Sequence, residues 1–214
     1  MNHTTASDTQ IDGAPLVGIR ILDVTHGVIG PTTTMVLAAL GAQVIKIEPP
    51  FLTGHRALPQ STPHTDKNVL DEPWNRVPTF NMLNRGKLSC PVNLSMIEGI
   101  TLFKNLVAIS DVVIDNFSPR VMRNFGLDHR VLIEHNPSII SLAMSGFGAN
   151  GPWGNRVGVG PSIDAITGIT DLTGYCEGGP VRPGMLNPDL NGGLFGALAV
   201  LAALDYRYQS GNGQ

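Results

Sequence analysis

The chain has 214 residues, of which 42% are hydrophobic and 14% are charged, and its formal net charge is -3 at pH 7. This composition is typical of one or two folded domains with a buried core and excludes a disordered chain. Because the basic residues are scattered, it also disfavours nucleic acid or an acidic membrane surface as the main partner.

The first part of the chain predicts a flexible leader followed by a parallel βαβ unit. Residues 1–13 are polar and lack the apolar core of a signal peptide, so we expect a flexible leader before a domain at residues 14–214. Leu16–Val24 has the pattern of a buried strand, Gly27–Leu40 that of a helix, and Ala42–Glu48 that of a second strand. A strand, a helix and a strand in this order indicate a parallel pair.

The stretch Phe51–Thr79 loses this periodicity and is rich in proline, histidine and polar residues. Such a long irregular stretch in a compact chain is usually a functional loop or a mobile one. His55 within it is a weak candidate for a general base, because a solvated loop histidine is the commoner case.

The second part of the chain continues the alternation of strands and helices. The basic turn Asn84–Ser89 leads into a short strand that ends near Val92, and Ser95 with Glu98 has the pattern of a capping box before an apolar helix. The remaining predicted elements are a strand at Asp111–Asp115, a short helix ending at Gly126, a helical turn at Asp128–His135, a strand at Ile139–Ala143, a helix at Pro161–Leu172 and a helix that begins near Asn191 or Gly192 and ends at Leu204. This alternation predicts an α/β fold, an open, mostly parallel, Rossmann-like sheet with helices on both faces.

The place of a ligand site follows from this fold class. Ligands of such sheets bind beyond the carboxyl ends of the strands, where loops and helix N-termini gather. We expect four segments to open there, namely His26–Pro31, Asn116–Pro119, Ser145–Pro152 and Asn187–Gly193. The third of these is rich in glycine but lacks the spacing of a dinucleotide fingerprint or a Walker loop, so we do not assign it as a phosphate site.

Cysteine usage and the apolar runs indicate the compartment. Cys90 and Cys176 lie far apart and have no partner at metal-ligand spacing, so neither a disulfide framework nor a metal site is predicted. No uncharged apolar run reaches the length of about 18 residues that a membrane span requires. We therefore expect a cytoplasmic protein that does not enter a membrane.

Asp189 lies in a glycine-rich segment before the last apolar helix, and two interpretations of it are open. An aspartate in this place is most often a cap that accepts unpaired backbone N–H groups. Alternatively, its carboxylate is a nucleophile toward an activated acyl group, with backbone donors nearby to stabilise the oxyanion. Gly192 and Gly193 would let a bulky thioester approach the backbone, because neither carries a side chain.

Several short segments share their order and spacing with one known family. They are Gly18–Asp23, Gly30–Pro31, Gly41–Pro50, Asn84–Lys87, Asp115–Pro119, Asn136–Pro137, Ser145–Gly148 and Gly211–Gln214. Each is weak alone, but together they make a specific signal over residues 14–214. The chain resembles the class III CoA-transferases of the CaiB/BaiF type, which include formyl-CoA transferase, carnitine CoA-transferase and α-methylacyl-CoA racemase.

The resemblance implies a catalytic role for Asp189. The family's catalytic aspartate lies in an Asp-x-x-x-Gly turn before a long helix, and Asp189 with Gly193 matches that pattern. By resemblance, Asp189 attacks an acyl-CoA thioester to give a mixed anhydride, the CoA thiolate returns to form an aspartyl-CoA thioester, and an acceptor carboxylic acid repeats the steps in reverse. The coenzyme A thioester is then a substrate, and no metal, redox or permanently bound cofactor is needed.

The same resemblance places CoA contacts on three segments. They comprise His26, Gly27 and Val28, then Asn84, Arg85 and Lys87, and finally Asn116 and Phe117. Lys87 or Arg85 could meet a CoA phosphate, and Phe117 could pack on the adenine. The alternatives are a solvated turn lysine for Lys87 and ordinary core packing for Phe117.

Three positions depart from the family's branches. Gly158-Val159-Gly160 stands where the racemase branch carries a His-Asp pair after its glycine, so the pair that would move an α-proton is missing and racemisation is disfavoured. Pro49 stands where the formyl-CoA branch has an arginine, so one CoA-phosphate contact of that branch is not expected. Asp164 lies in an amphipathic helix, and we expect it at the surface or as a cap.

Length is the remaining departure. Family members continue past the Gly-x-Gly-Gln segment with a second, smaller domain and pair as interlocked rings, whereas this chain ends at Gly211–Gln214. The resemblance thus implies the N-terminal portion of the large domain, with an interlocked homodimer or a complementary C-terminal portion as partner. Three functions stay open, which are CoA transfer from an acyl-CoA to a carboxylic acid, isomerisation at the α-carbon of an acyl-CoA, and a CoA-binding or pairing module without activity alone.

Overall fold

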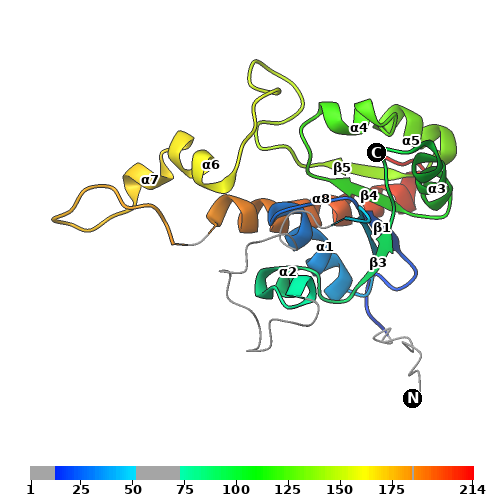
Figure 1. The fold of residues 1–214 in the computed structure, drawn as a ribbon, viewed down its shortest axis with the longest axis horizontal. Helices are drawn as coiled ribbons and strands as arrows, with labels where there is room; N and C mark the ends of the chain where they lie inside the picture. Colours follow the sequence, from blue (N-terminus) through cyan, green and yellow to red (C-terminus); the bar gives the residue numbers. More distant parts are fainter. Residues whose placement is uncertain (1–12, 52–72, 185) are drawn as a thin grey trace.

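The computed structural model describes residues 13–51, 73–184 and 186–214, which contain a parallel sheet of five strands (Figure 1). The strands are β1 (Arg20–Asp23), β2 (Gln43–Glu48), β3 (Lys87–Pro91), β4 (Val112–Asp115) and β5 (Ile140–Ala143). Their order is β3-β2-β1-β4-β5, and every neighbouring pair is parallel. The predicted α/β fold is confirmed, with β1 at the centre of the sheet.

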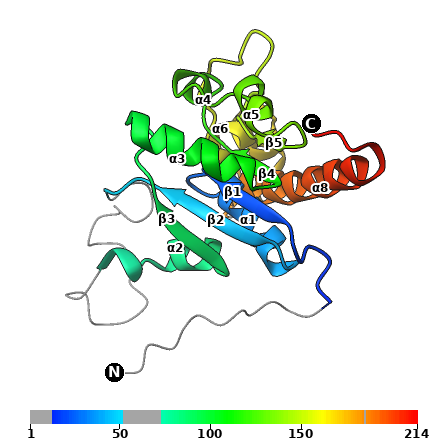
Figure 2. The same cartoon turned by 90° about the vertical axis from the view of Figure 1, so that its right-hand side faces the viewer.

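Helices cover both faces of this sheet (Figure 2). One face carries α1 (Ile29–Ala39) and the long α8 (Asn187–Ser210), which pack on each other. The opposite face carries α3 (Ile97–Ala108), α4 (Arg120–Asn124) and α5 (His129–His135). The remaining helices are α2 (Pro78–Leu83), α6 (Gly160–Ile166) and α7 (Ile169–Leu172), and α6 and α7 form an arm that projects from the body in Figure 1.

Alternation of side chains along the strands divides the core into two layers. Ile21 of β1 packs with Leu37 of α1 and Val200 of α8 on one face, and the next residue, Leu22, packs with Phe103 of α3 on the other. All of these side chains are buried. Burying one large apolar side chain contributes roughly 1.5–3 kcal/mol. The sheet is therefore a rigid support for the loops at its carboxyl edge.

The start of α8 differs from the prediction. The helix begins at Asn187 rather than near Asn191 or Gly192, so the segment predicted as a turn forms its first turn. Pro188 fits there because a first-turn residue needs no N–H donor for the helix. Asp189 is consequently inside the helix rather than before it.

Two other predicted elements are also wrong in detail. Ser95 is not a cap, since α3 begins at Ile97 and the backbone N–H of Ser95 donates to Asn93 Oδ1. The helix predicted at Pro161–Leu172 is divided into α6 and α7 at Gly168, whose φ of 81° lies in the left-handed region.

Some predictions fall on residues that the structure does not describe. The leader over residues 1–12 and the central part of the irregular stretch, including His55, lie outside the described residues. The described end of that stretch holds a 3-10 turn at Pro73–Asn75 and the start of α2. Among the helices described, none is long and apolar enough to cross a membrane.

Candidate active site

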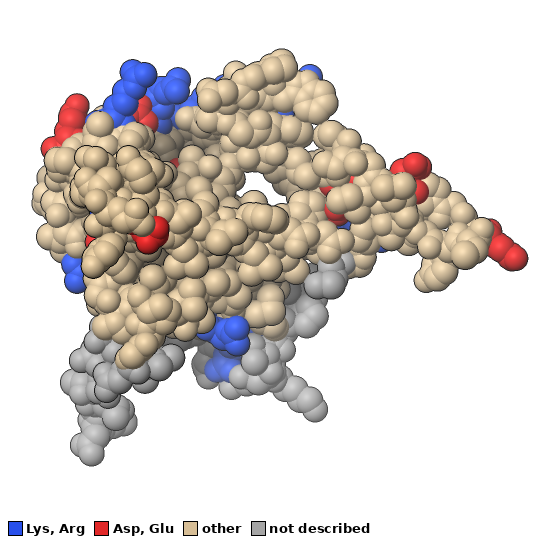
Figure 3. Space-filling view, turned by 180° about the vertical axis from the view of Figure 1, so that it is seen from behind, with Lys and Arg blue, Asp and Glu red and all other residues tan. Residues whose placement is uncertain are grey.

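A cavity of about 440 Å³ lies at the carboxyl edge of the sheet, and an opening beside the α6–α7 arm is visible in Figure 3. It is lined by the loop after β1, the segment after β4, the glycine-rich segment after β5, the start of α6 and the first turn of α8. The four segments predicted to meet therefore do meet. The predicted site residues that line this cavity are His26, Gly27, Val28, Asn116, Phe117 and Asp189.

Asp189 is the third residue of α8 and borders the cavity. It is half-buried and lies against Gly160, where an added Cβ would overlap Asp189 Oδ2. Burial raises the pKa of Asp189 and the carboxylate of Asp164 raises it further, whereas a hydrogen bond from the backbone N–H of Asp189 lowers it. Asp189 is thus a stronger base than an exposed aspartate.

Gly192 and Gly193 do not form the open turn that was predicted. Both lie inside α8, where the missing side chains permit close packing on α1. A Cβ at Gly192 would lie 2.6 Å from Ile29 Cδ1, and a Cβ at Gly193 would lie 2.6 Å from Thr32 Cβ. Thr33 Oγ1 also donates a 2.9 Å hydrogen bond to the Gly193 carbonyl oxygen. The prediction of an open turn is therefore wrong, and these two glycines are not part of the candidate site.

Asn116 fixes the loop after β1 through two hydrogen bonds to one residue. Its Oδ1 accepts from the backbone N–H of His26 at 2.8 Å, and its Nδ2 donates to the His26 carbonyl oxygen at 2.6 Å. The His26 ring lies 5.4 Å from the ring of Phe117. Burial lowers the pKa of His26, and Lys46 lowers it further, so the neutral imidazole is favoured. Phe117 packs against a core layer, as one interpretation predicts, and it also borders the cavity.

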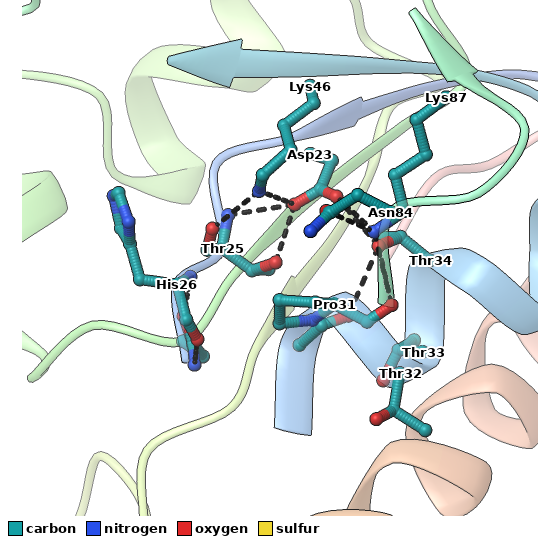
Figure 4. Close-up of polar contacts among 12 residues, drawn as sticks. Asp23, Thr25, His26, Pro31, Thr32, Thr33, Thr34, Lys46, Asn84 and Lys87 are labelled. Carbon is teal, nitrogen blue, oxygen red and sulfur yellow. Dashed lines mark hydrogen bonds and ion pairs between the residues drawn. The ribbon is translucent and has the colours of Figure 1, made fainter. Parts of the chain in front are cut away.

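A network of buried charges lies behind the same loop (Figure 4). Asp23 is fully buried and contacts Lys87 Nζ at 3.0 Å and Lys46 Nζ at 3.5 Å. The hydroxyls of Thr25 and Thr34 also donate to its carboxylate. Burial raises the pKa of Asp23, but the two ammonium groups and the two hydroxyls outweigh burial and lower that pKa to about 2. Asp23 is a charged link between β1, β2 and β3.

Asn84, Arg85 and Lys87 lie on the β3 side of the sheet edge. Asn84 borders a second cavity of about 420 Å³, which shares His26 and Gly27 with the first. The Lys87 side chain is 2% exposed, and its Nζ contacts Asp23, the Pro31 carbonyl oxygen and Asn84 Oδ1.

These contacts exclude one of the two interpretations of Lys87. Burial lowers the pKa of Lys87 to about 8, although Asp23 opposes that effect. The alternative of a solvated turn lysine is therefore wrong for Lys87, and a phosphate contact through its ammonium would have to replace existing partners. Arg85 is exposed, so it is the more accessible of the two to an anionic ligand.

Asp164 contradicts its predicted place at the surface. It lies in α6, is 2% exposed, and its Oδ1 has no hydrogen-bond partner in the described part of the chain. Its burial accompanies the packing of α6 on α8, two helices that are distant in sequence. No local sequence pattern around Asp164 signals this burial, because it depends on contact with a helix that is distant in sequence.

The described ranges contain no group of three or more His, Cys, Asp or Glu side chains that could hold a metal ion. What the cavity does present is a carboxylate, an amide, an imidazole and a phenyl ring. Such groups suit an organic ligand that has polar and planar parts.

Comparisons with known proteins agree over nearly the whole chain. The family model described as CoA-transferase family III matches residues 16–214. A succinyl-CoA:glutarate CoA-transferase of Mus musculus is 36% identical over 199 residues, which are 93% of this chain and 44% of that protein. A succinyl-CoA--L-malate CoA-transferase beta subunit of Chloroflexus aurantiacus is 37% identical over 202 residues, which are 94% of this chain and 47% of that protein. The chain spans about half the length of these curated relatives.

Solved structures show the same architecture. A CAIB/BAIF family protein from Brucella suis has a TM-score of 0.86 and 34% sequence identity, covering 94% of this chain and 52% of that chain. A hypothetical protein from Mycobacterium tuberculosis has a TM-score of 0.81 and 33% identity, covering 93% of this chain and 53% of that chain. The fold described above is therefore shared with experimentally determined relatives.

Proposed function

The chain belongs to CoA-transferase family III, and from that premise we propose that it takes part in CoA transfer between carboxylic acids, with Asp189 as the nucleophile. One observation carries the proposal. The Asp189 carboxylate borders the same cavity as His26, Asn116 and Phe117, although these residues come from three distant segments of the chain. A thioester bound by the loops after β1 and β4 would then lie beside a carboxylate.

The proposed reaction has four covalent steps. Asp189 attacks the thioester carbonyl of the donor, the C–S bond breaks, and CoA leaves as a thiolate from an aspartyl–acyl anhydride. The thiolate attacks the aspartyl carbonyl, which releases the donor acid and leaves an aspartyl-CoA thioester. The acceptor carboxylate attacks this thioester to form a second anhydride and free the thiolate again. Attack of the thiolate on the acceptor's acyl carbon then releases the new acyl-CoA and restores the Asp189 carboxylate.

The environment of Asp189 suits this role. Partial burial raises its pKa above the ordinary value of 3.8, which makes its ionised form more basic and hence more nucleophilic. Gly160 leaves Asp189 Oδ2 unobstructed, because any side chain at that position would overlap the oxygen. The same overlap leaves no room at position 160 for the acid or base that α-proton transfer would need, which supports transfer over isomerisation.

We propose that CoA binds at the two cavities that His26 borders. The adenine would pack on the neighbouring rings of His26 and Phe117, since stacked planar rings attract one another. The exposed guanidinium of Arg85 would meet a phosphate, because guanidinium groups bind phosphate oxygens through charged hydrogen bonds.

We propose that the exposed apolar side chains of α8 contact a partner, either a second copy of the chain or a complementary C-terminal portion. The chain spans about half the length of its curated relatives, and one of these relatives is named as a subunit. The start of α8 also exposes Leu194, Phe195 and Leu198, with more than half of each side chain's surface accessible. Apolar side chains that gather on one exposed stretch are typical of an interface.

Trapping of the covalent intermediate tests the proposal. The intact protein would be incubated with acetyl-CoA and then with hydroxylamine, and peptides would be examined by mass spectrometry for a hydroxamate. We expect the hydroxamate on Asp189, because hydroxylamine attacks both an aspartyl anhydride and an aspartyl thioester. Asp189→Asn should abolish the label, and Asp171→Asn, at an exposed acid of α7, should retain it.

Two results would contradict the assignment. The first is a label on another residue, with none on Asp189, in protein that binds acetyl-CoA. The second is unchanged CoA exchange in Asp189→Asn. Exchange of deuterium into the α-carbon of the acyl-CoA without an acceptor acid would instead support isomerisation.

A further inference from the structure

Asp164 is a buried acidic group that the proposed reaction does not use. It is 2% exposed, and its Oδ1 has no hydrogen-bond partner among the described residues. A buried carboxylate normally has its oxygens satisfied, because leaving them without water or donors is unfavourable by several kcal/mol, on the order of 2–7. A carboxylate kept in such a place calls for an explanation in function.

The position of Asp164 relates it to Asp189. Gly160 and Asp164 are four residues apart in α6, so they lie on the same face of that helix, one turn from each other. Gly160 faces Asp189 Oδ2, and α6 packs on α8. The face of α6 that lies against the Asp189 carboxylate at Gly160 thus also carries Asp164, one helical turn further along.

We propose that Asp164 is a positioning residue for Asp189, whose negative charge destabilises the Asp189 carboxylate before attack and so speeds its acylation. This inference rests on the proposed function of Asp189 as the nucleophile. Burial is the main cause of the raised pKa of Asp189, and the carboxylate of Asp164 raises that pKa further, as a like charge on the facing turn of α6 should. Acylation relieves the repulsion, because the aspartyl anhydride is neutral and the negative charge leaves with the CoA sulfur.

No other described group near Asp189 can take this role. Helix α1, which packs on α8, carries no titratable side chain, and β5 carries none either. His26 is the remaining titratable side chain on the cavity wall, and an imidazole is neutral or positive, so it cannot supply a negative charge. Asp171 of α7 is exposed, so water screens its charge.

Asp164→Asn separates this role from a structural one, because the amide keeps the shape of the side chain and removes its charge. We expect acylation of Asp189 to slow roughly ten-fold, a usual size for coupling between neighbouring groups. The acid limb of the rate against pH should move to lower pH, since Asp189 loses its like-charged neighbour. The melting temperature should not fall, because the amide has nearly the same shape and Asp164 Oδ1 has no hydrogen-bond partner among the described residues to lose.

Two variants serve as controls in the intact protein. Asp164→Glu keeps the charge and should keep the acid limb near its original pH, even if its longer side chain alters the rate. Asp171→Asn makes the same change of net charge at an exposed site, and both the acid limb and the rate should stay as in the parent protein.

A second readout makes the inference independent of catalysis. Titration of the Asp189 carboxyl carbon by nuclear magnetic resonance, in protein labelled with 13C-aspartate, should show a lower pKa in Asp164→Asn. An unchanged Asp189 titration, or an unchanged acid limb with a lower melting temperature, would overturn the role of Asp164 and leave the nucleophile assignment standing. A shifted titration without any hydroxamate on Asp189 would overturn the nucleophile assignment, and with it the effect of Asp164 on catalysis.

Discussion

Asp23 and Asp189 occupy two neighbouring regions of the molecule and have opposite surroundings. Asp23 ends the central strand, is fully buried, and has two ammonium groups and two hydroxyls as partners, which lower its pKa to about 2. Asp189 lies in the first turn of α8 and borders a cavity, and its pKa is raised by burial first and by the Asp164 carboxylate second. Partners of opposite charge make an aspartate inert and stabilising, whereas burial beside a like charge makes it basic and reactive.

The two regions are connected through the loop after β1. Lys46 Nζ donates a 2.8 Å hydrogen bond to the Thr25 carbonyl oxygen, directly before His26. His26 in turn borders both cavities and is fixed by Asn116. The paired charges around Asp23 therefore hold in place a loop that lines the cavity beside Asp189.

The largest effect on stability is expected from Asp23→Asn. The substitution leaves the ammonium groups of Lys46 and Lys87 buried without their common partner, and breaking a buried ion pair in this way lowers stability by about 3–5 kcal/mol. Denaturant unfolding followed by circular dichroism measures the loss. Asp171→Asn is the matched control, and we expect it to change stability by less than about 0.5 kcal/mol. A loss in Asp23→Asn no larger than in this control would show that the network does not support the fold.

Asp23 should also make the free energy of unfolding depend on pH, and this effect is smaller than that of the substitution. The pKa of Asp23 is about 2 in the folded state against an ordinary 3.8, so the unfolded chain binds the proton more readily. The stabilisation is fully present above the ordinary pKa, amounts to about 2 kcal/mol, and is lost as pH falls through about 2. The difference in the free energy of unfolding between the parent protein and Asp23→Asn should therefore shrink by about 2 kcal/mol at low pH.

Asp115 should change the free energy of unfolding with pH in the opposite direction to Asp23, and the same measurement tests both groups. Burial raises its pKa to about 6, although the N–H of Phe117 opposes that effect. The folded state therefore binds the Asp115 proton more readily, and this group adds stability as pH falls from about 6 toward 4. A parent curve that rises over this range and then falls would fit both groups, whereas a difference between parent and Asp23→Asn that is constant with pH would contradict the role of Asp23.

The sequence predicted β1, β2, β4 and β5 well because they lie in short runs rich in apolar and β-branched residues, whereas the first residues of β3, Lys87–Ser89, were assigned to a turn. It failed at the start of α8, since glycine and proline read as turn residues, whereas contact of Gly193 with α1 offsets the poor helix propensity of glycine. It also failed for Lys87 and Asp164. Their burial depends on Asp23 and on α8, which are remote in sequence, and charged residues are rarely buried. The neighbours that shift the pKa of Asp23 and of Asp189 are thus brought to them by tertiary contacts.

Gly193→Ala tests the packing that carries Asp189. The new Cβ would lie 2.6 Å from Thr32 Cβ and 2.9 Å from the Ile29 carbonyl oxygen, so α1 or α8 must move. Overpacking is unfavourable by roughly 1–3 kcal/mol, while alanine favours a helix by about 1 kcal/mol over glycine, which leaves a net loss of about 1 kcal/mol. Denaturant unfolding measures this loss. Gly211→Ala is an unsuitable control because of its positive φ, so Ser210→Ala at the exposed end of α8 should be compared, and an equal change in both would contradict the close contact.

Asp189→Asn should give the smallest change in stability. The carboxylate gains from the dipole at the start of α8, but it loses from partial burial and from the charge of Asp164, so these effects nearly cancel. We expect the free energy of unfolding to change by less than about 0.5 kcal/mol, while CoA exchange falls by about 1,000-fold or more because the proposed nucleophile is gone. Unfolding and exchange measured on the same preparation decide the point. If Asp189→Asn unfolded as readily as Asp23→Asn, the contrast between the two aspartates would fail, since both would then be structural.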